Sequence, residues 1–423
     1  MEKIAGIVLM TALFSSVFTV VNAEEKNADS LVIYLHNRLN VSRVDEAVSI
    51  DIAAITKKFS GLNVGECAVY DKGIELASQA DDTNRDGTPD LLTFLASFAP
   101  NEKKKIVLKN ILPGAPRHEM KKRTQAELSV KVGYEYIDGR FTKGKFVNID
   151  SIRVPANHVD HDALFRYEGP GWESDKAAYR FYLDARNRTD IFGKKVPEMV
   201  LQTVGVNDLV ADNNESYQSM MSWGMDVFKV GTSLGIGSIA MPVGKEVVTV
   251  SKTDSVFCVI AANGPVRSDV RANYYGWTAG EEKYDLVSDY SITGGSRLTK
   301  HSLQITTNAD NLCTGLAKHE GTILIEPKER KAGQWQYLGL YGKQSRFGDD
   351  MGIAIFFNGS DFLERREDAV SQLVILKPGS GKLTYYFAEA WVQEPGGIKT
   401  IEEFREYLEA ESQKLDSPIE VSY

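Results

Sequence analysis

Closely spaced Gly, Pro, Asn and Asp residues divide most of the chain into short runs of β-branched, aromatic and aliphatic residues. Runs of this length bounded by turn-forming residues are typical of antiparallel strands joined by tight turns. The runs in the first third of the chain are 31–35, 47–52, 68–70, 91–96, 105–108, 127–136 and 146–149. The later runs are 179–186, 247–250, 256–260, 288–292, 302–306, 321–325, 351–357, 373–376 and 384–390. We therefore predict an all-β, mostly antiparallel protein built as a large β-sandwich with few helices.

The clearest helix signal lies near the end of the chain. Thr400 and Glu403 have the spacing of a capping box, in which each side chain accepts a hydrogen bond from the other residue's backbone. Ile401, Phe404 and Leu408 supply an apolar face at helical spacing. We expect a helix here that packs against the sandwich edge.

The one candidate domain boundary lies near Ser151, because the predicted strands after it are longer and contain more aromatic residues. It predicts an N-terminal β-sandwich portion over 24–150 and a larger β-sandwich portion over 151–423, which carries the helix. A single continuous domain with an internal seam is the alternative.

Residues 1–23 have the pattern of a signal peptide. Lys3 precedes an apolar run over 4–21, and Val21-Asn22-Ala23 fits the small-residue rule for cleavage after Ala23. An uncleaved anchor is the alternative, and no later apolar run is long enough to span a membrane. We expect a periplasmic or secreted bacterial protein.

Net charge and cysteine content restrict the binding partners, disulfides and metal sites that the chain can have. A net charge of −9 disfavours a nucleic-acid partner, although a local basic cluster can still bind an anion. The three cysteines, Cys67, Cys258 and Cys313, make no disulfide framework and no Cys-x-x-Cys zinc motif. Cys258 and Cys313 either pair with each other or pack as apolar residues.

The segment 157–190 is the most polar aromatic-rich stretch, with 14 ionisable side chains and six aromatic ones among its 34 residues. Such charges are costly to bury without partners. They are expected where a polar, sugar-like or anionic ligand is bound, and a solvated rim of loops is the alternative. Trp172, next to the turn Gly169-Pro170-Gly171, favours the ligand site.

Alternation within 179–186 places Arg180, Tyr182, Asp184 and Arg186 on one strand face and apolar residues on the other. One face can pack in a core while the other presents guanidinium, phenol and carboxylate groups.

The cluster His158-Val-Asp160-His161-Asp162 allows three roles: contact with a ligand or catalysis, metal binding, or structural hydrogen bonding. In an extended strand His158, Asp160 and Asp162 share one face. Their side chains would then stand roughly 6.5–7 Å apart, which is wide for one ion, so a metal site requires a turn.

Two further patterns can be explained either by ligand binding or by a purely structural role. Trp223 and Lys229 share a strand face opposite Asp226, and Trp172 and Trp223 are candidates for stacking on a sugar or for packing in a core. The loop Asp82, Asn84, Asp86, Asp90 matches part of a calcium loop but has Thr93 at the twelfth position. It predicts either a structural Ca²⁺ or a tight turn.

Six segments carry a resemblance to a known family: 157–175, 179–184, 190–195, 223–226, 231–238 and 335–338. They resemble a bacterial family, long described only as a domain of unknown function, that occurs in gene clusters for breakdown of algal and plant polysaccharides. The resemblance implies a β-sandwich of the mutarotase and uronate-lyase type. It also implies a member similar to an ulvan oligosaccharide dehydratase, which removes water from a non-reducing-end glucuronic or iduronic acid and leaves a 4,5-unsaturated sugar.

For such a reaction the residue types suggest roles. Arg180 and Arg166 are candidates for clamping the uronate carboxylate, with Lys229 in reserve. His158 or His161 suits one proton-transfer role and Tyr182 the other. The remaining candidates for contacts to an acidic, possibly sulfated, oligosaccharide are Trp172, Asp184 and Trp223. The alternatives are a polysaccharide lyase, a non-catalytic glycan-binding protein and, less favoured, a mutarotase or epimerase.

Overall fold

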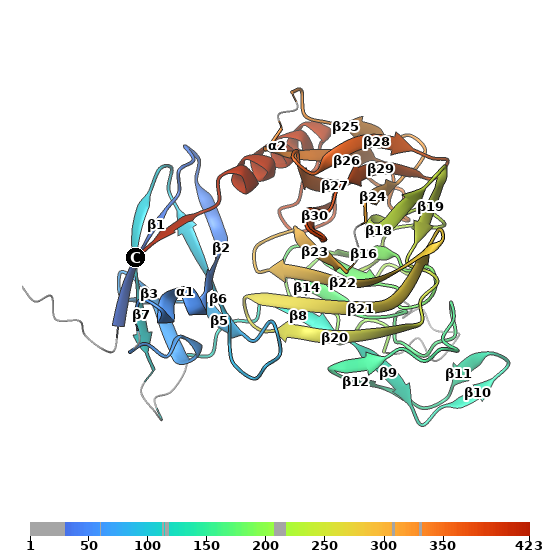
Figure 1. Cartoon of the computed structure of the whole chain (residues 1–423), viewed down its shortest axis with the longest axis horizontal. Coiled ribbons are helices and arrows are strands. Elements are labelled where there is room, and N and C mark those ends of the chain that lie inside the picture. The colour runs from blue at the N-terminus through green and yellow to red at the C-terminus, as the bar shows by residue number, and fades with distance from the viewer. Residues whose placement is uncertain are drawn as a thin grey trace, which may run out of the picture.

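The structure of the protein, a computed structural model, describes residues 30–59, 61–111, 114, 118–206, 217–306, 309–329 and 332–423. These residues form antiparallel sheets with two α-helices and one short 3-10 helix, which confirms the predicted all-β fold class (Figure 1). The predicted signal peptide, residues 1–23, lies outside the described residues. Within the described part of the chain, every helix is too short or too polar to cross a membrane.

A smaller sandwich is built mainly from the first strands, shown in blue in Figure 1. Its five-stranded sheet has the order β31 (Glu420–Ser422), β1 (Ser30–His36), β7 (Lys103–Asn110), β3 (Cys67–Asp71) and β4 (Ile74–Leu76). Its three-stranded sheet has the order β2 (Arg43–Asp51), β6 (Leu91–Phe98) and β5 (Ser78–Asp81), and the short helices α1 (Ile52–Thr56) and η1 (Val64–Glu66) connect the two sheets. Alternate residues such as Ile33, Ile106 and Phe94 point into one apolar core.

A larger sandwich contains the remaining sheets. Its nine-stranded sheet has the order β13 (Ser151–Arg153), β20 (Ser255–Asn263), β21 (Arg267–Ala279), β22 (Glu282–Thr293), β23 (Thr299–Ile305), β30 (Lys382–Trp391), β27 (Met351–Asn358), β26 (Trp335–Gly342) and β25 (Ile323–Ile325). One five-stranded sheet has the order β17 (Gly224–Asp226), β16 (Thr189–Lys194), β15 (Ala178–Phe181), β14 (Gly171–Ser174) and β8 (Thr124–Glu127). The other has the order β19 (Glu246–Thr249), β18 (Ile236–Val243), β24 (Leu312–Ala317), β29 (Ser371–Leu376) and β28 (Phe362–Glu367). Two small ladders project at one end: β9 (Ser129–Val132) with β12 (Lys145–Asn148), and β10 (Glu135–Ile137) with β11 (Arg140–Thr142).

The main core lies between the nine-stranded sheet and the two five-stranded sheets. Val270 of β21 and Ile353 of β27 belong to the same apolar cluster as Ile191 of β16 and Ile239 of β18. The period-two alternation of strands therefore leaves the opposite face of the nine-stranded sheet free to carry polar residues. Cys258 and Cys313 are buried free thiols, so they pack as apolar residues, and burial raises the pKa of each to about 12.

The predicted C-terminal helix is confirmed as α2 (Ile401–Asp416). Thr400 caps it by accepting a hydrogen bond from the Glu403 amide at 3.1 Å. Phe404 and Leu408 pack on the outer face of the nine-stranded sheet near its edge. The fit requires Gly352 on β27, where an added Cβ would lie 2.5 Å from the Phe404 ring.

Two of the predicted runs are divided in the structure. The run 127–136 is split among β8, β9 and β10, and the run 179–186 is a strand only as far as Phe181, because residues 182–188 form the turn into β16. The strands pass from the smaller to the larger sandwich between β7 and β8, since β8 already pairs with β14.

Candidate functional site

A charged pocket of about 590 Å³ lies beside the sheet that ends in β17. Five cationic side chains, three carboxylates and two imidazoles line it. These ten residues are His161, Glu168, Arg180, Arg186, Asp190, Asp226, Lys229, His319, Lys343 and Arg346, and the remaining polar lining is Tyr182, Gln218, Gln344 and Ser345. We call this lining the charged pocket.

Arg180 is the buried centre of the charged pocket. It lies on β15 directly opposite Asp190 of β16, on the strand face away from the core residue Phe181. Its Nη2 donates to Asp190 Oδ2 at 2.6 Å and to Asp226 Oδ2 at 2.9 Å. Burial opposes the guanidinium charge, but Asp226 and the other acidic neighbours outweigh it and raise the pKa of Arg180 well above its usual value. Two carboxylates thus hold Arg180 through Nη2, while its Nη1 makes no hydrogen bond and lies 3.4 Å from the Glu168 carboxylate.

Burial changes the ionisation of Asp226, a carboxylate of the charged pocket. Burial raises its pKa to about 7, against the opposing charge of Arg180 and with the help of the nearby Asp190 charge. Arg346 Nη1 donates to its Oδ2 at 3.1 Å, and its Oδ1 has no hydrogen-bond partner. Asp226 can therefore carry a proton near neutral pH.

Tyr182 forms the wall beside Arg180. Its hydroxyl donates to Asp190 Oδ2 at 2.5 Å, and burial raises the pKa of the phenol well above its usual value. The Arg186 guanidinium stacks on the Tyr182 ring at 4.0 Å from the centroid. Arg186 also pairs with Glu168 at 2.7 Å and with Asp184 at 2.6 Å, so its charge is shared among acids.

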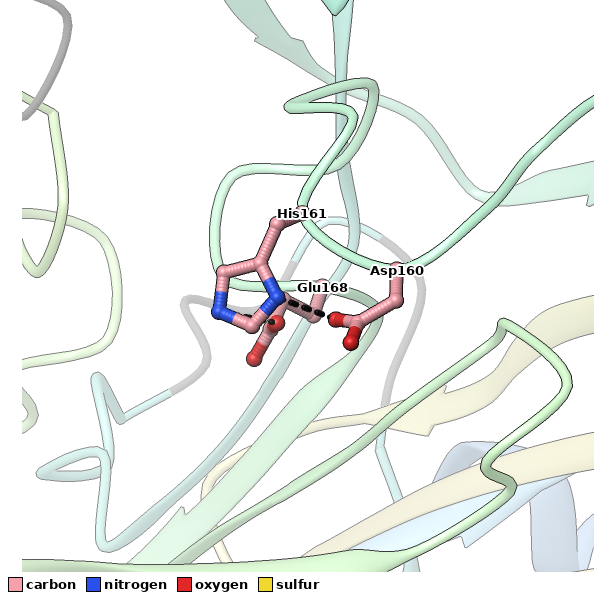
Figure 2. A group of neighbouring side chains, drawn as sticks. All are labelled: Asp160, His161 and Glu168. Atoms are coloured by element: carbon pink, nitrogen blue, oxygen red, sulfur yellow. Dashed lines mark ion pairs between the residues drawn. The ribbon is translucent and has the colours of Figure 1, made fainter.

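Asp160, His161 and Glu168 form a cluster at the mouth of the charged pocket (Figure 2). His161 has a φ of 58° in a turn, so the extended arrangement considered for 158–162 is wrong. Its Nδ1 faces Asp160 and its Nε2 lies 3.6 Å from Glu168. The three ligand atoms lie within 4.8 Å of one another, which is close enough to hold a metal ion. Arg186 Nη2 already pairs with both carboxylates, and a cation would have to compete with it.

Lys229 and His319 complete the charged pocket from other parts of the chain. Lys229 is exposed, and its ammonium makes no hydrogen bond or ion pair with any residue that the structure describes. The His319 ring bonds to the Lys229 backbone, and its buried Nε2 has no hydrogen-bond partner. Burial lowers the pKa of His319, against the hydrogen bond to the Lys229 backbone and with the help of the Lys229 charge, so the imidazole is neutral at neutral pH.

Of the residues predicted from sequence, His161, Arg180, Tyr182 and Lys229 are brought together in the charged pocket. Sequence reasoning did not select Glu168, Asp190, His319 or Arg346 as site residues. Their signal was weak, because His319 and Arg346 stand alone in the sequence and reach the pocket only through long-range strand pairing.

The structure corrects the roles predicted for His158 and Arg166, because both side chains are buried away from the charged pocket. The His158 Nδ1 pairs with Asp162 at 2.8 Å, which is the structural hydrogen-bonding alternative for this cluster. Arg166 donates to the carbonyl of Leu201 at 2.8 Å and pairs with Glu127 at 2.6 Å, so its guanidinium holds two loops together. Neither side chain can reach a ligand in this pocket.

Trp172, Asp184 and Trp223 also lie outside the pocket lining. Trp172 is fully buried, stacked between Tyr179 and Tyr290, and cannot stack on a sugar. The Asp184 carboxylate is buried against Arg186 and positions that guanidinium. Trp223 is half-buried in an apolar cluster with the ring of Phe192.

The calcium-like loop folds as a tight turn whose side chains bind its own backbone. Asp82 Oδ2 accepts from the Gly87 amide at 2.7 Å, and Asn84 Oδ1 accepts from the Asp86 amide at 2.8 Å. Asp90 accepts from the Thr83 hydroxyl at 2.8 Å. These bonds account for the Asx-rich sequence, and a structural Ca²⁺ there stays a prediction.

The fold and the pocket together define an antiparallel all-β protein with one densely charged, solvent-accessible pocket on a sandwich edge. The chain belongs to the family described as Domain of unknown function (DUF4861), whose model matches residues 35–421. It is 23% identical to "Uncharacterized protein P7" of Formosa agariphila over 444 residues, which covers 98% of this chain and 99% of that protein.

Two solved structures from Enterococcus faecalis are similar in outline. A protein in the glycosyl hydrolase family 38 matches with a TM-score of 0.46 at 10% identity, covering 94% of this chain and 47% of that one. An α-mannosidase matches with a TM-score of 0.44 at 11% identity, covering 93% and 46% respectively. The chain therefore spans about half the length of each of these two proteins.

Proposed function

We propose that the protein is a carbohydrate-active hydro-lyase. Its substrate is an acidic oligosaccharide of the ulvan type that ends in glucuronic or iduronic acid at the non-reducing end. The reaction removes water across C4 and C5 and leaves a 4,5-unsaturated uronate. The observation that carries this proposal is that three groups line one pocket: an ammonium with no partner among the described residues, a neutral imidazole and a proton-holding carboxylate.

Neutralising the substrate carboxylate is the main task, because a C5 proton beside an ionised carboxylate is only weakly acidic. Lys229 is suited to this role, since no carboxylate of the described residues pairs with its ammonium. Arg346 can assist, since its guanidinium lines the same pocket and donates to Asp226. Arg180, the first candidate from sequence, instead fixes Asp190 and Asp226 and acts as a positioning residue. Preorganised charge of this kind is usually the largest catalytic contribution.

The hydrogen bonding and pKa of the pocket residues suggest which group is the base and which is the acid. The neutral His319 accepts the C5 proton on its unpartnered Nε2, the electron pair forms the C4–C5 double bond, and the C4–O bond breaks. Asp226 in its protonated form gives its proton to the departing hydroxyl, which leaves as water. A general acid works best with a pKa near the working pH, which favours Asp226 over Tyr182. His161 is less suited as the base, because both its ring nitrogens face carboxylates.

Mass spectrometry on glucuronate-terminated oligosaccharides tests the proposal. Loss of one water with unchanged chain length, together with new ultraviolet absorbance, is the expected result. Shortened chains with unsaturated ends would make the protein a polysaccharide lyase. Binding with no new absorbance and no mass change would make it a glycan-binding protein, and an isomer of unchanged mass a mutarotase or epimerase.

The substitution Lys229→Gln removes the unpaired ammonium and should lower kcat/KM by roughly 10²-fold, the usual effect of losing one preorganised electrostatic group. The matched control is Lys245→Gln, an exposed lysine that does not line the pocket and should leave kcat/KM unchanged. Equal rates for the two variants would remove Lys229 from the mechanism.

A further inference from the structure

A second cleft, of about 720 Å³, lies between the two sandwiches. Its floor is the outer face of the nine-stranded sheet at β21, β22 and β23, and its walls are β2 of the smaller sandwich and the last turns of α2. We call it the inter-sandwich cleft. It shares no lining residue with the charged pocket.

A row of polar side chains crosses the floor of the inter-sandwich cleft. Asp269 of β21 lies opposite Ser291 of β22, Ser291 opposite Lys300 of β23, and Lys300 opposite Tyr386 of β30. Directly opposed residues on antiparallel strands have Cβ atoms about 4.5–5.5 Å apart. The row therefore presents a carboxylate, a hydroxyl, an ammonium and a phenol along one line about the length of a short oligosaccharide.

Two polar atoms in this row, the Lys300 ammonium and one oxygen of Asp269, have no hydrogen-bond partner among the described residues. Lys300 makes no hydrogen bond or ion pair with any residue in the described ranges, whereas its neighbour Arg267 is held by Asp81 and Asp269. Asp269 is 3% exposed, and its Oδ1 has no hydrogen-bond partner. Since buried polar groups are nearly always satisfied, this carboxylate oxygen and the free ammonium together mark a place for a polar ligand.

Aromatic rings lie beside the free ammonium. Tyr386 and Trp335 are half-buried in the wall of the cleft, with ring centroids 5.2 Å apart in an edge-to-face arrangement. A ring face that packs on the C–H groups of a sugar, next to a cation that binds its carboxylate or sulfate, is the combination that recognises an acidic saccharide. The neighbouring charges of the cleft are paired, as Arg271 is with Asp289 at 2.5 Å, so the Lys300 ammonium stands out among the described residues.

We propose that the inter-sandwich cleft is a second binding site for an acidic oligosaccharide. Lys300 binds a carboxylate or sulfate of the sugar, Tyr386 packs on its ring, and Asp269 accepts from a hydroxyl. This site holds the glycan away from the charged pocket and does not depend on the function proposed for that pocket.

Calorimetric titration with a tetrasaccharide that ends in glucuronic acid tests this proposal. The titration is best made on the Lys229→Gln protein, in which the charged pocket is weakened and turnover is low. One tetrasaccharide per chain should still bind. Adding Lys300→Gln should weaken that binding by about tenfold or more, the usual effect of losing one charge-assisted hydrogen bond. An uncharged tetrasaccharide of the same length should bind weakly to both proteins.

The matched control is Lys382→Gln, which removes an exposed lysine from β30 of the same sheet outside the cleft lining. It should leave the titration unchanged. Equal affinity with and without Lys300→Gln, or no binding to the Lys229→Gln protein, would overturn the second site. Binding that depends on Lys300 in a protein that releases no water from the tetrasaccharide would retain the second site and reject the hydro-lyase.

Discussion

Two charged clusters on the same five-stranded sheet differ in how completely they are satisfied. Lys194 of β16 donates to Glu173 of β14 at 2.6 Å and to a backbone carbonyl at 2.7 Å. The other Glu173 oxygen accepts from the amides of Val200 and Leu201 at 2.7 and 2.8 Å. The cluster of Arg180 and Asp226 faces a pocket and is less complete: Asp226 Oδ1 makes no hydrogen bond, and Arg180 Nη1 has only a looser ion pair with Glu168 at 3.4 Å.

This comparison shows that charge density alone does not identify a ligand site. Both clusters come from the segment and strands that are richest in charge, yet the Lys194 and Glu173 pair has the closed bonding of a structural element. Unsatisfied bonding capacity beside open space is the feature that separates the two. Substitutions in each cluster test whether the closed one is structural and the open one functional.

Breaking the closed cluster should have the largest effect on stability. Lys194→Met leaves the fully buried Glu173 carboxylate without a counter-charge and should lower the free energy of unfolding by about 3–5 kcal/mol. Urea denaturation measures the change. Adding Glu173→Gln should recover much of the loss. In contrast, Lys229→Gln should change stability by less than about 0.5 kcal/mol, because its ammonium is exposed and unpaired. A similar loss in both lysine variants would remove the distinction.

The two imidazoles of the open cluster should differ in their effect on turnover. His319→Gln removes the neutral base and should lower kcat by roughly 10²–10⁴-fold. His161→Gln should lower kcat by less than about tenfold, because that ring is committed to Asp160 and Glu168. Steady-state kinetics with a glucuronate-terminated substrate, alongside circular dichroism of both variants, measures the difference. The reverse order of the two effects would transfer the base role to His161.

The ionisation of Asp226 should have a smaller, pH-dependent effect on stability. Because burial raises its pKa from 3.8 to about 7, the folded state favours the protonated form. Its contribution is fully present below pH 3.8 and is lost as the pH rises through about 7. Asp226→Asn, which resembles the protonated form, should therefore gain stability relative to the native chain as the pH rises over that window. Urea denaturation at several pH values tests this. A difference that does not vary with pH would mean that Asp226 stays ionised.

The sequence predicts the strands and one wall of the site well, because both depend on local patterns. Alternation in 179–186 predicts a face with Arg180 and Tyr182, and the structure places both in the charged pocket although the strand ends at Phe181. The capping residues of α2 are equally local.

The rest of the site depends on contacts between distant residues, which local patterns do not contain. The sequence suggests that Arg166 contacts a ligand, but in the structure Glu127 of β8 neutralises it. Trp172 reads like a stacking platform until Tyr290, from β22, is seen to cover it. No local pattern marks His319, and only the turn after β24 brings it to Lys229.

The pairing of β31 with β1 limits how the two sandwiches can move. The chain crosses from one sandwich to the other after β7 and returns between α2 and β31, so two covalent connections join them. Buried contacts add to these connections, since Arg267 of β21 pairs with Asp81 of β5 at 3.0 Å. Deleting residues 420–423 would remove β31 and leave the smaller sandwich attached by one covalent connection and these contacts.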